Sequence, residues 1–123
     1  MNEQPLEKAL TVWTDGNEPL LIPCTLDGQP QNWENWTDFE LIVADSASDA
    51  TADLVATVIP QEGGKLLVEF DEAALKTLLP YNASSDSRRM QYVLRARPVG
   101  TYRVRLMFGQ FTIKKGLPEA TQA

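Results

Sequence analysis

The residues from Met90 to Phe108 contain two runs in which apolar and polar positions alternate. The apolar members are Met90, Tyr92, Leu94 and Ala96 in the first run, and Tyr102, Val104, Leu106 and Phe108 in the second. Alternation with a period of two is typical of strands that bury one face. The three residues between the runs, Val99 to Thr101, suit a hairpin loop because Gly100 can adopt a positive φ. The two runs are therefore predicted to form a β-hairpin.

Six further segments have the length and apolar content of short strands. Glycine, proline, asparagine and aspartate separate most of them, as expected for turns. Pro23 lies inside the second segment and predicts that this strand lies at a sheet edge or a bulge, because proline cannot donate to a β-ladder. The predicted strands cover residues 9–14, 20–26, 39–44, 54–59, 65–70 and, after Gly109, 110–115.

One helix is expected in addition to the strands. Asp71 can cap a helix over 72–79, and Pro80 ends it. Seven to eight short strands with frequent turns and one short helix predict an all-β fold, an antiparallel immunoglobulin-like β-sandwich. The disulfide and tryptophan spacing of true immunoglobulins is absent, so the prediction concerns the architecture alone.

The 123 residues are expected to form one domain. We expect a flexible leader at 1–7, a single β-sandwich domain at 8–116 and a flexible tail at 117–123. The sequence has no long uncharged apolar run, and its N-terminus lacks the basic and apolar regions of a secretory signal, so a soluble protein made in the cytosol is expected. Cys24, the only cysteine, cannot form an internal disulfide and is expected to be a small buried side chain.

Charge is distributed very unevenly along the chain. Residues 1–87 hold 16 of the 17 acidic residues and three lysines, a net charge of −13, whereas residues 88–118 hold six arginines and two lysines, a net charge of +8. Such segregation favours association with a complementary surface. The overall charge of −6 argues against nucleic acid as the main partner. All arginines lie in the basic segment: Arg88, Arg89, Arg95, Arg97, Arg103 and Arg105.

The hairpin predicts where four of these arginines lie. Arg97 should face Arg103, and Arg95 should face Arg105, on the exposed side of the sheet. Like charges opposite one another weaken a sheet, so this face is expected to find carboxylates elsewhere. Two sources remain open: acids of the same fold, such as Glu40 or Glu69, and acids of another molecule. We take the six arginines as the candidate protein interface.

The residues needed for the commonest catalytic mechanisms are missing. The chain has no histidine, the usual general base, and a single cysteine cannot build a zinc site. Asp45, Asp49 and Asp53 recur at four-residue intervals, but calcium-binding loops place their ligands at alternate positions, so a solvated acidic loop is favoured. We therefore expect no enzyme activity, no cofactor and no metal.

Two tryptophans suggest an alternative function. Trp33 and Trp36 lie in a polar segment before a predicted strand, where exposed rings could stack on sugars. Large aromatic side chains are more often partly buried, and one of them could instead close the end of the core. A carbohydrate-binding module that uses Trp33 and Trp36 as a glycan platform is the alternative hypothesis.

Several short turn and strand motifs follow one another along the chain. They are Leu-Asp-Gly-Gln-Pro at 26–30, Trp-Thr-Asp-Phe at 36–39, Gly-Gly-Lys at 63–65 and Gln-Tyr-Val-Leu at 91–94, followed by Gly109 before a closing strand. Over residues 8–116 the chain resembles the small β-sandwich domains of tailed-bacteriophage virion proteins, such as baseplate upper proteins, tail-fibre adaptors and capsid-decorating domains. Baseplate proteins of this type continue into a stalk and a receptor-binding part, and we expect neither here.

The resemblance and the charge pattern predict the same class of function. We expect a non-enzymatic structural protein of a bacteriophage virion, a tail or baseplate adaptor or a capsid decoration subunit. It would be located in the virion and dock on other virion proteins, with a homo-oligomer or other symmetric assembly expected and no nucleic acid or membrane partner. The loose ends of the chain could become ordered on binding.

Overall fold

A computed structural model describes residues 6–16, 19–26, 29–30, 32–46, 52–80 and 82–116. Its regular elements are nearly all strands. In chain order they are β1 (Leu6–Glu7), β2 (Leu10–Trp13), β3 (Leu20–Pro23), β4 (Thr25–Leu26), β5 (Gln29–Pro30), β6 (Trp36–Ala44), β7 (Leu54–Gln61), the 3₁₀ turn Glu62–Gly64, β8 (Lys65–Glu69), α1 (Glu72–Leu78), β9 (Ser87–Pro98) and β10 (Val104–Lys114).

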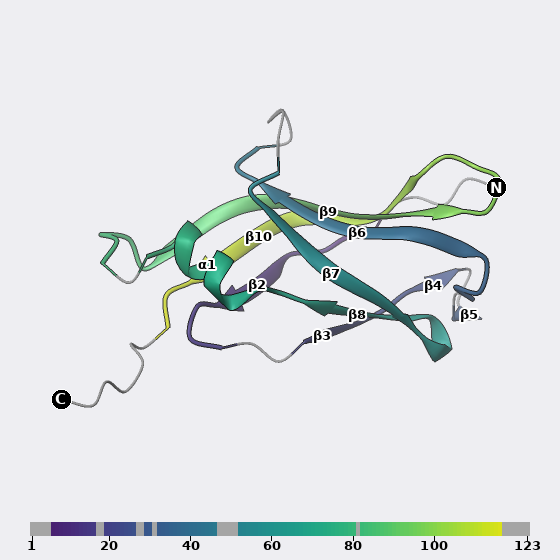
Figure 1. Cartoon of the computed structure of the whole chain (residues 1–123), viewed down its shortest axis with the longest axis horizontal. Coiled ribbons are helices and arrows are strands. Elements are labelled where there is room, and N and C mark those ends of the chain that lie inside the picture. The colour runs from purple at the N-terminus through teal and green to yellow at the C-terminus, as the bar shows by residue number, and fades with distance from the viewer. Residues whose placement is uncertain are drawn as a thin grey trace.

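Most strands belong to a single sheet that curls on itself. Its strand order is β1-β10-β9-β6-β7-β8-β3, and β2 also pairs with β10. The curl depends on β7, whose first half pairs with β6 and whose second half pairs with β8. Figure 1 shows β7 crossing from the layer that contains β6, β9 and β10 to the layer that contains β8 and β3. The small β4–β5 hairpin stands apart from this sheet.

The all-β prediction is confirmed, whereas the purely antiparallel pairing was wrong. β1 and β2 both run parallel to β10, with Leu6 opposite Met107 and Leu10 opposite Phe111. Such pairing joins opposite ends of the sequence, and the alternation within one strand does not specify its direction relative to a distant partner. The described strands therefore form a mixed, curled sheet.

The predicted boundaries mostly agree with the structure. β3 ends the strand order, as expected from Pro23. Asp71 caps α1, since its Oδ1 accepts a hydrogen bond from the backbone N–H of Ala73 (3.2 Å). Two predictions were wrong: residues 6–7 of the expected leader form β1, and β10 continues through Gly109 as one strand. The remaining leader residues and the tail lie outside the described residues.

The core lies inside the curl. Leu41, Leu66, Leu94 and Phe111, from four different strands, are fully buried. The rings of Phe70 and Phe111 lie 5.4 Å apart, which joins the end of β8 to β10 across the two layers. Cys24, expected to be buried, is half-buried and packs against this core, and burial raises the pKa of its thiol. None of the described helices is long and apolar enough to cross a membrane.

A tyrosine ties the first segment of the chain to the middle of the sheet. The Tyr92 hydroxyl donates a 2.6 Å hydrogen bond to the carbonyl of Lys8, in the link between β1 and β2. Burial raises the pKa of Tyr92 to about 12, above the ordinary tyrosine value of about 10.

We expect this buried phenol to be visible in an alkaline titration. A folded-state pKa above the unfolded value means that the folded protein holds the proton more tightly, so stability is lost as pH rises from about 10 towards 12. Tyrosinate absorbance should show a component near pH 12 that is missing in Tyr92→Phe. If the variant retained this component, another residue would be responsible.

Candidate functional site

The arginine-bearing hairpin is formed by β9 and β10. Arg95 lies opposite Arg105, as predicted, and Gly100 in the turn has a φ of +78°. The ladder begins at the pair of Val104 and Ala96, so the predicted pairing of Arg97 with Arg103 is absent and Arg97 lies opposite Thr37 on β6. The hairpin therefore presents its arginines outward, next to β6.

Two bulges flank β9 near Arg95. On β6 the register shifts between Thr37 and Glu40, where Asp38 has a φ of +56°, and on β10 it shifts around Leu106. Bulges increase local twist and re-aim side chains. The end of the hairpin extends beyond the body of the sheet in Figure 1.

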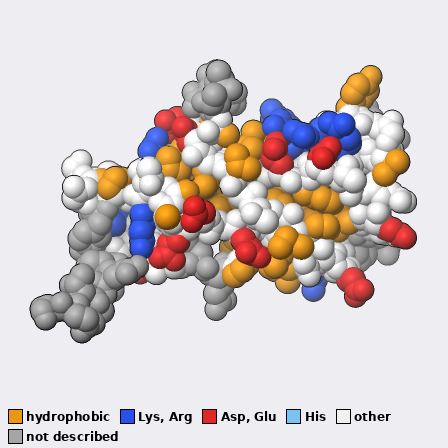
Figure 2. Space-filling model, viewed as in Figure 1, with side chains coloured by type: hydrophobic (Ala, Val, Ile, Leu, Met, Phe, Trp, Pro, Cys, Tyr) orange, Lys and Arg blue, Asp and Glu red, His pale blue; other side chains and the backbone are white. Residues whose placement is uncertain are grey.

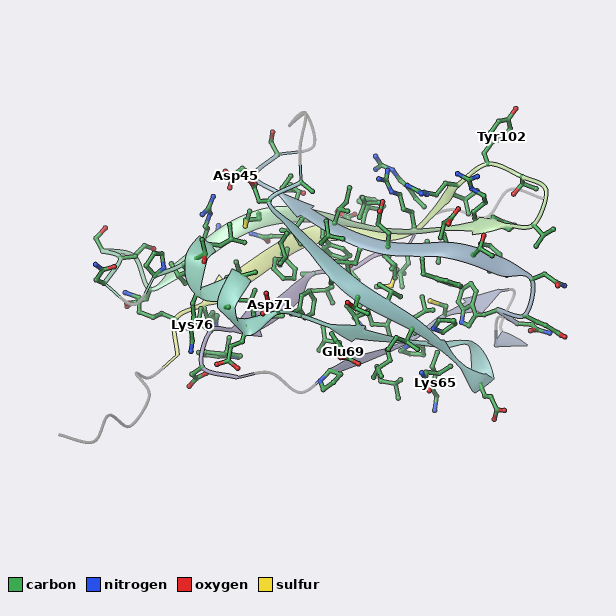
Figure 3. The ribbon with its side chains drawn as sticks, viewed as in Figure 1. Asp45, Lys65, Glu69, Asp71, Lys76 and Tyr102 are labelled. Carbon is green, nitrogen blue, oxygen red and sulfur yellow. The ribbon has the colours of Figure 1, made fainter. Side chains whose placement is uncertain are left out.

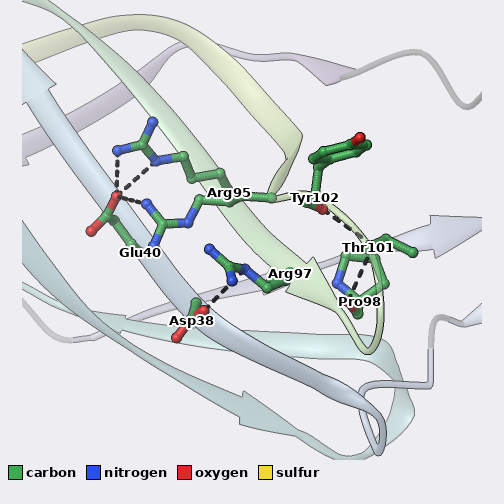
Figure 4. Close-up of polar contacts among 8 residues, drawn as sticks. Asp38, Glu40, Arg95, Arg97, Pro98, Thr101 and Tyr102 are labelled. Carbon is green, nitrogen blue, oxygen red and sulfur yellow. Dashed lines mark hydrogen bonds and ion pairs between the residues drawn. The ribbon is translucent and has the colours of Figure 1, made fainter.

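Carboxylates on β6 neutralise the centre of the arginine face. Glu40 Oε1 lies 2.6 Å from Arg95 Nη2 and 3.1 Å from Arg103 Nη1, and Asp38 Oδ2 lies 3.2 Å from Arg97 Nε. Figure 4 shows both acids pointing at the arginines from one strand. Of the two acids proposed from the sequence, Glu40 is confirmed as a partner, whereas Glu69 forms no ion pair among the described residues.

Arg88 has a structural role at the other end of β9. Its guanidinium donates to Leu78 O (2.8 Å), at the end of α1, and to both carboxylate oxygens of Asp45 (2.9 and 3.0 Å). A cation is stabilising at a helix C-terminus. Asp45, one of the three aspartates considered as calcium ligands, thus pairs with an arginine. Asp49, another of the three, lies outside the described residues.

Arg89 and Arg105 differ from the other four arginines. Both are exposed, and neither forms an ion pair within the described part of the chain. Among the described residues, acids thus pair with four of the arginines and not with Arg89 or Arg105.

An apolar row crosses the same outward face. Val55, Ile42, Val93 and Phe108 are direct neighbours on the adjacent strands β7, β6, β9 and β10. Val55 is 59% exposed, and the other three are half-buried. Arg95 follows Val93 on the same face of β9, and Arg105 lies opposite Arg95 on β10. We call the apolar row together with Arg89, Arg95 and Arg105 the docking face, which combines apolar and basic groups.

The turn of the hairpin carries the most exposed aromatic residue of the described chain. Tyr102 is 89% exposed and Val99 is 66% exposed. Tyr102 points away from the protein body (Figure 3), and Figure 2 shows a protruding hydrophobic side chain beside the cluster of basic groups. We call residues 99–105 the hairpin tip.

Sequence alternation predicted a half-buried position for Tyr102, and this was wrong. Tyr102 precedes β10, which begins at Val104, and so lies in the turn. Within β10, the extra residue at Leu106 shifts the alternation, so that Met107 points inward instead of Leu106 and Phe108. The mixture of a tyrosine with arginines near a glycine turn could have indicated the tip, because Tyr and Arg are enriched where interfaces concentrate their binding energy.

The two candidate glycan-binding tryptophans form part of the core. Trp33 is only 7% exposed, and its ring makes edge-on contacts with Trp36 (5.2 Å) and Phe39 (5.4 Å). Trp36 is half-buried. Because Trp33 cannot offer an open ring face, the two rings do not form an exposed platform; Trp33 instead closes one end of the core.

A groove of about 500 Å³ lies beside this aromatic cluster. The Trp33 Nε1 atom is buried without a hydrogen-bond partner, which costs about 1–3 kcal/mol for a buried donor. Glu34 and Glu62 are exposed on the groove, and neither has an ion pair within the described residues. The groove residues are Asn32, Trp33, Glu34, Pro60, Gln61, Glu62 and Gly63.

Comparison with known proteins does not place the chain in a family. No protein-family model matches the sequence, and no curated protein matches it at a significant level.

Proposed function

We propose that this chain is a non-enzymatic structural protein of a bacteriophage virion, a tail or baseplate adaptor or a capsid decoration subunit. It docks on other virion proteins through the docking face and the hairpin tip. One observation carries the proposal: Arg89 and Arg105, which form no ion pair with a described residue, flank an outward apolar row, next to a tip on which Tyr102 is 89% exposed.

The composition of this surface favours a protein partner. Tyrosine and arginine dominate the energetically important positions of interfaces, and arginine binds carboxylates with two parallel hydrogen bonds. The contacts of Glu40 with Arg95 and Arg103 hold these side chains in place before binding. Binding then costs less side-chain entropy than it would for free arginines.

The fold is compatible with the family that the sequence resembles. We infer that the curled sheet is an opened immunoglobulin-like sandwich, with β3 and β8 in one layer and β6, β9 and β10 in the other. Sandwiches of this class place the second and fifth strands together and the third, sixth and seventh in the facing sheet. Counted from β2 as the first strand, β3 and β8 are the second and fifth strands, and β6, β9 and β10 are the third, sixth and seventh. The fourth strand, β7, then crosses between the two layers.

Particle composition tests the proposal. Virions are purified by density gradient from cells that make the chain, and the protein is quantified in them by mass spectrometry. We expect a constant number of copies per particle that survives washing at low salt. If the chain remained in the soluble fraction and was absent from the particles, the virion assignment would be wrong.

A further inference from the structure

The hairpin tip and the groove lie at the same end of the molecule. The backbone N–H of Val99 donates a 2.9 Å hydrogen bond to Asn35 O, and Trp36 pairs with Pro98. The segment that contributes Asn32, Trp33 and Glu34 to the groove is therefore joined directly to the base of the hairpin. Both surfaces are therefore available at one end of the molecule.

These two surfaces are complementary in charge and shape. The groove is concave and carries two carboxylates, Glu34 and Glu62, without a cation among its lining residues. The tip is convex and carries Arg105, which has no ion pair with any described residue, beside the exposed Tyr102. Opposite charges at a contact increase both specificity and the rate of association.

The tip does not occupy the groove of its own chain. Tyr102 is 89% exposed, and Figure 3 shows it pointing away from the body. A tyrosine side chain combines an apolar ring with a polar hydroxyl, which suits a groove lined by both apolar and polar residues.

We propose that the groove of one copy binds the hairpin tip of a second copy, with Tyr102 in the groove and Arg105 opposite Glu34 and Glu62. Because each copy offers a tip and a groove at the same end, the reciprocal contact closes into a two-fold symmetric dimer. This inference rests on the proposed function, in which the arginine-bearing hairpin docks on carboxylates, and it names a second copy as one of its partners.

A charge-swap experiment tests the contact. Light scattering after size exclusion gives the mass of the wild type, of the tip variant Arg105→Glu and of the groove variant Glu34→Arg with Glu62→Arg, over a concentration series. We expect a wild-type dimer and at least a tenfold weaker dimer for each variant alone, since each then opposes like charges. An equimolar mixture of the two variants should restore dimerisation, because both of its contacts again join opposite charges.

Matched substitutions control for general charge effects. Lys114→Glu and Glu69→Arg change exposed residues outside the docking face, the tip and the groove and should leave the dimer intact, whereas Tyr102→Ala should weaken it at least tenfold. A wild type that stays monomeric, or a mixture that stays monomeric, would overturn the inference. If the monomeric chain still occurred in purified virions, only the dimer would be excluded and the proposed function would stand.

Discussion

Gly109→Ala is expected to lower the free energy of unfolding by about 3 kcal/mol or more, a loss typical of strained backbone positions combined with a steric clash. A Cβ atom at this position would lie 2.5 Å from Lys8 O and 3.0 Å from Lys8 C. Both are backbone atoms, so no side-chain rotation can relieve the contact. The φ of +155° is a conformation that residues with a side chain rarely adopt.

The effect should extend to the first strands. The same Lys8 carbonyl accepts the hydrogen bond from Tyr92, and Lys8 N–H donates to Phe108 O (2.9 Å). Displacing Lys8 would disturb the pairing of β1 and β2 with β10.

Urea unfolding monitored by tryptophan fluorescence measures this loss. Gly100→Ala provides the matched control, because Gly100 also has a positive φ (+78°) but would place its Cβ in open space. We expect this control to cost only about 1 kcal/mol, the usual penalty for a side chain in that conformation. Equal losses of unfolding free energy in the two variants would show that the close approach of Lys8 to Gly109 does not add to the cost of a side chain at this position.

Reversing the charge of Arg95 and Arg103, which pair with Glu40, should lower the free energy of unfolding far more than reversing the charge of Arg89 and Arg105. Arg95→Glu combined with Arg103→Glu would place two new carboxylates beside Glu40, whose side chain is only 27% exposed. We expect a loss of about 2 kcal/mol or more, in the range for broken, partly buried charge networks. Arg89→Glu with Arg105→Glu changes the net charge equally but breaks no described ion pair, and should cost less than about 0.5 kcal/mol.

The same unfolding assay compares the two double variants. A third variant, Glu40→Gln with Arg95→Gln and Arg103→Gln, removes the charges without creating repulsion and should recover part of the loss. Similar stability of the two arginine double variants would mean that the contacts with Glu40 contribute little in solution. It would also remove the argument that Glu40 holds these arginines in place for binding.

The elements of the hairpin could be predicted from sequence because they depend on local pattern. The alternation from Met90 to Ala96 predicted β9, and the hairpin loop predicted the facing pair of Arg95 and Arg105. Glu40 was a proposed partner because it lies in the acid-rich first two-thirds of the chain. Such inferences need only neighbouring residues and the twofold period of a strand.

The features that sequence reasoning missed arise from irregularity or from distant pairing. The extra residue at Leu106 turns Met107 inward and Phe108 outward, and no local composition marks a bulge there. Tyr102 is exposed because β10 begins only at Val104, so that this residue lies in the turn. Gly109 suggested a break between strands, whereas its role is to admit the backbone of Lys8, more than 100 residues earlier in the chain. The burial of Trp33 likewise depends on Phe39 and the curl of the sheet.

Docking through the arginine-bearing outward face is tested most directly by the number of copies per particle. Wild type, Arg89→Glu with Arg105→Glu, and the control Lys65→Glu would be quantified in purified virions after expression at equal levels. We expect at least a tenfold reduction for the arginine variant, equivalent to about 1.4 kcal/mol of binding free energy, and no change for the control. Wild-type occupancy by a folded arginine variant would contradict docking through this face.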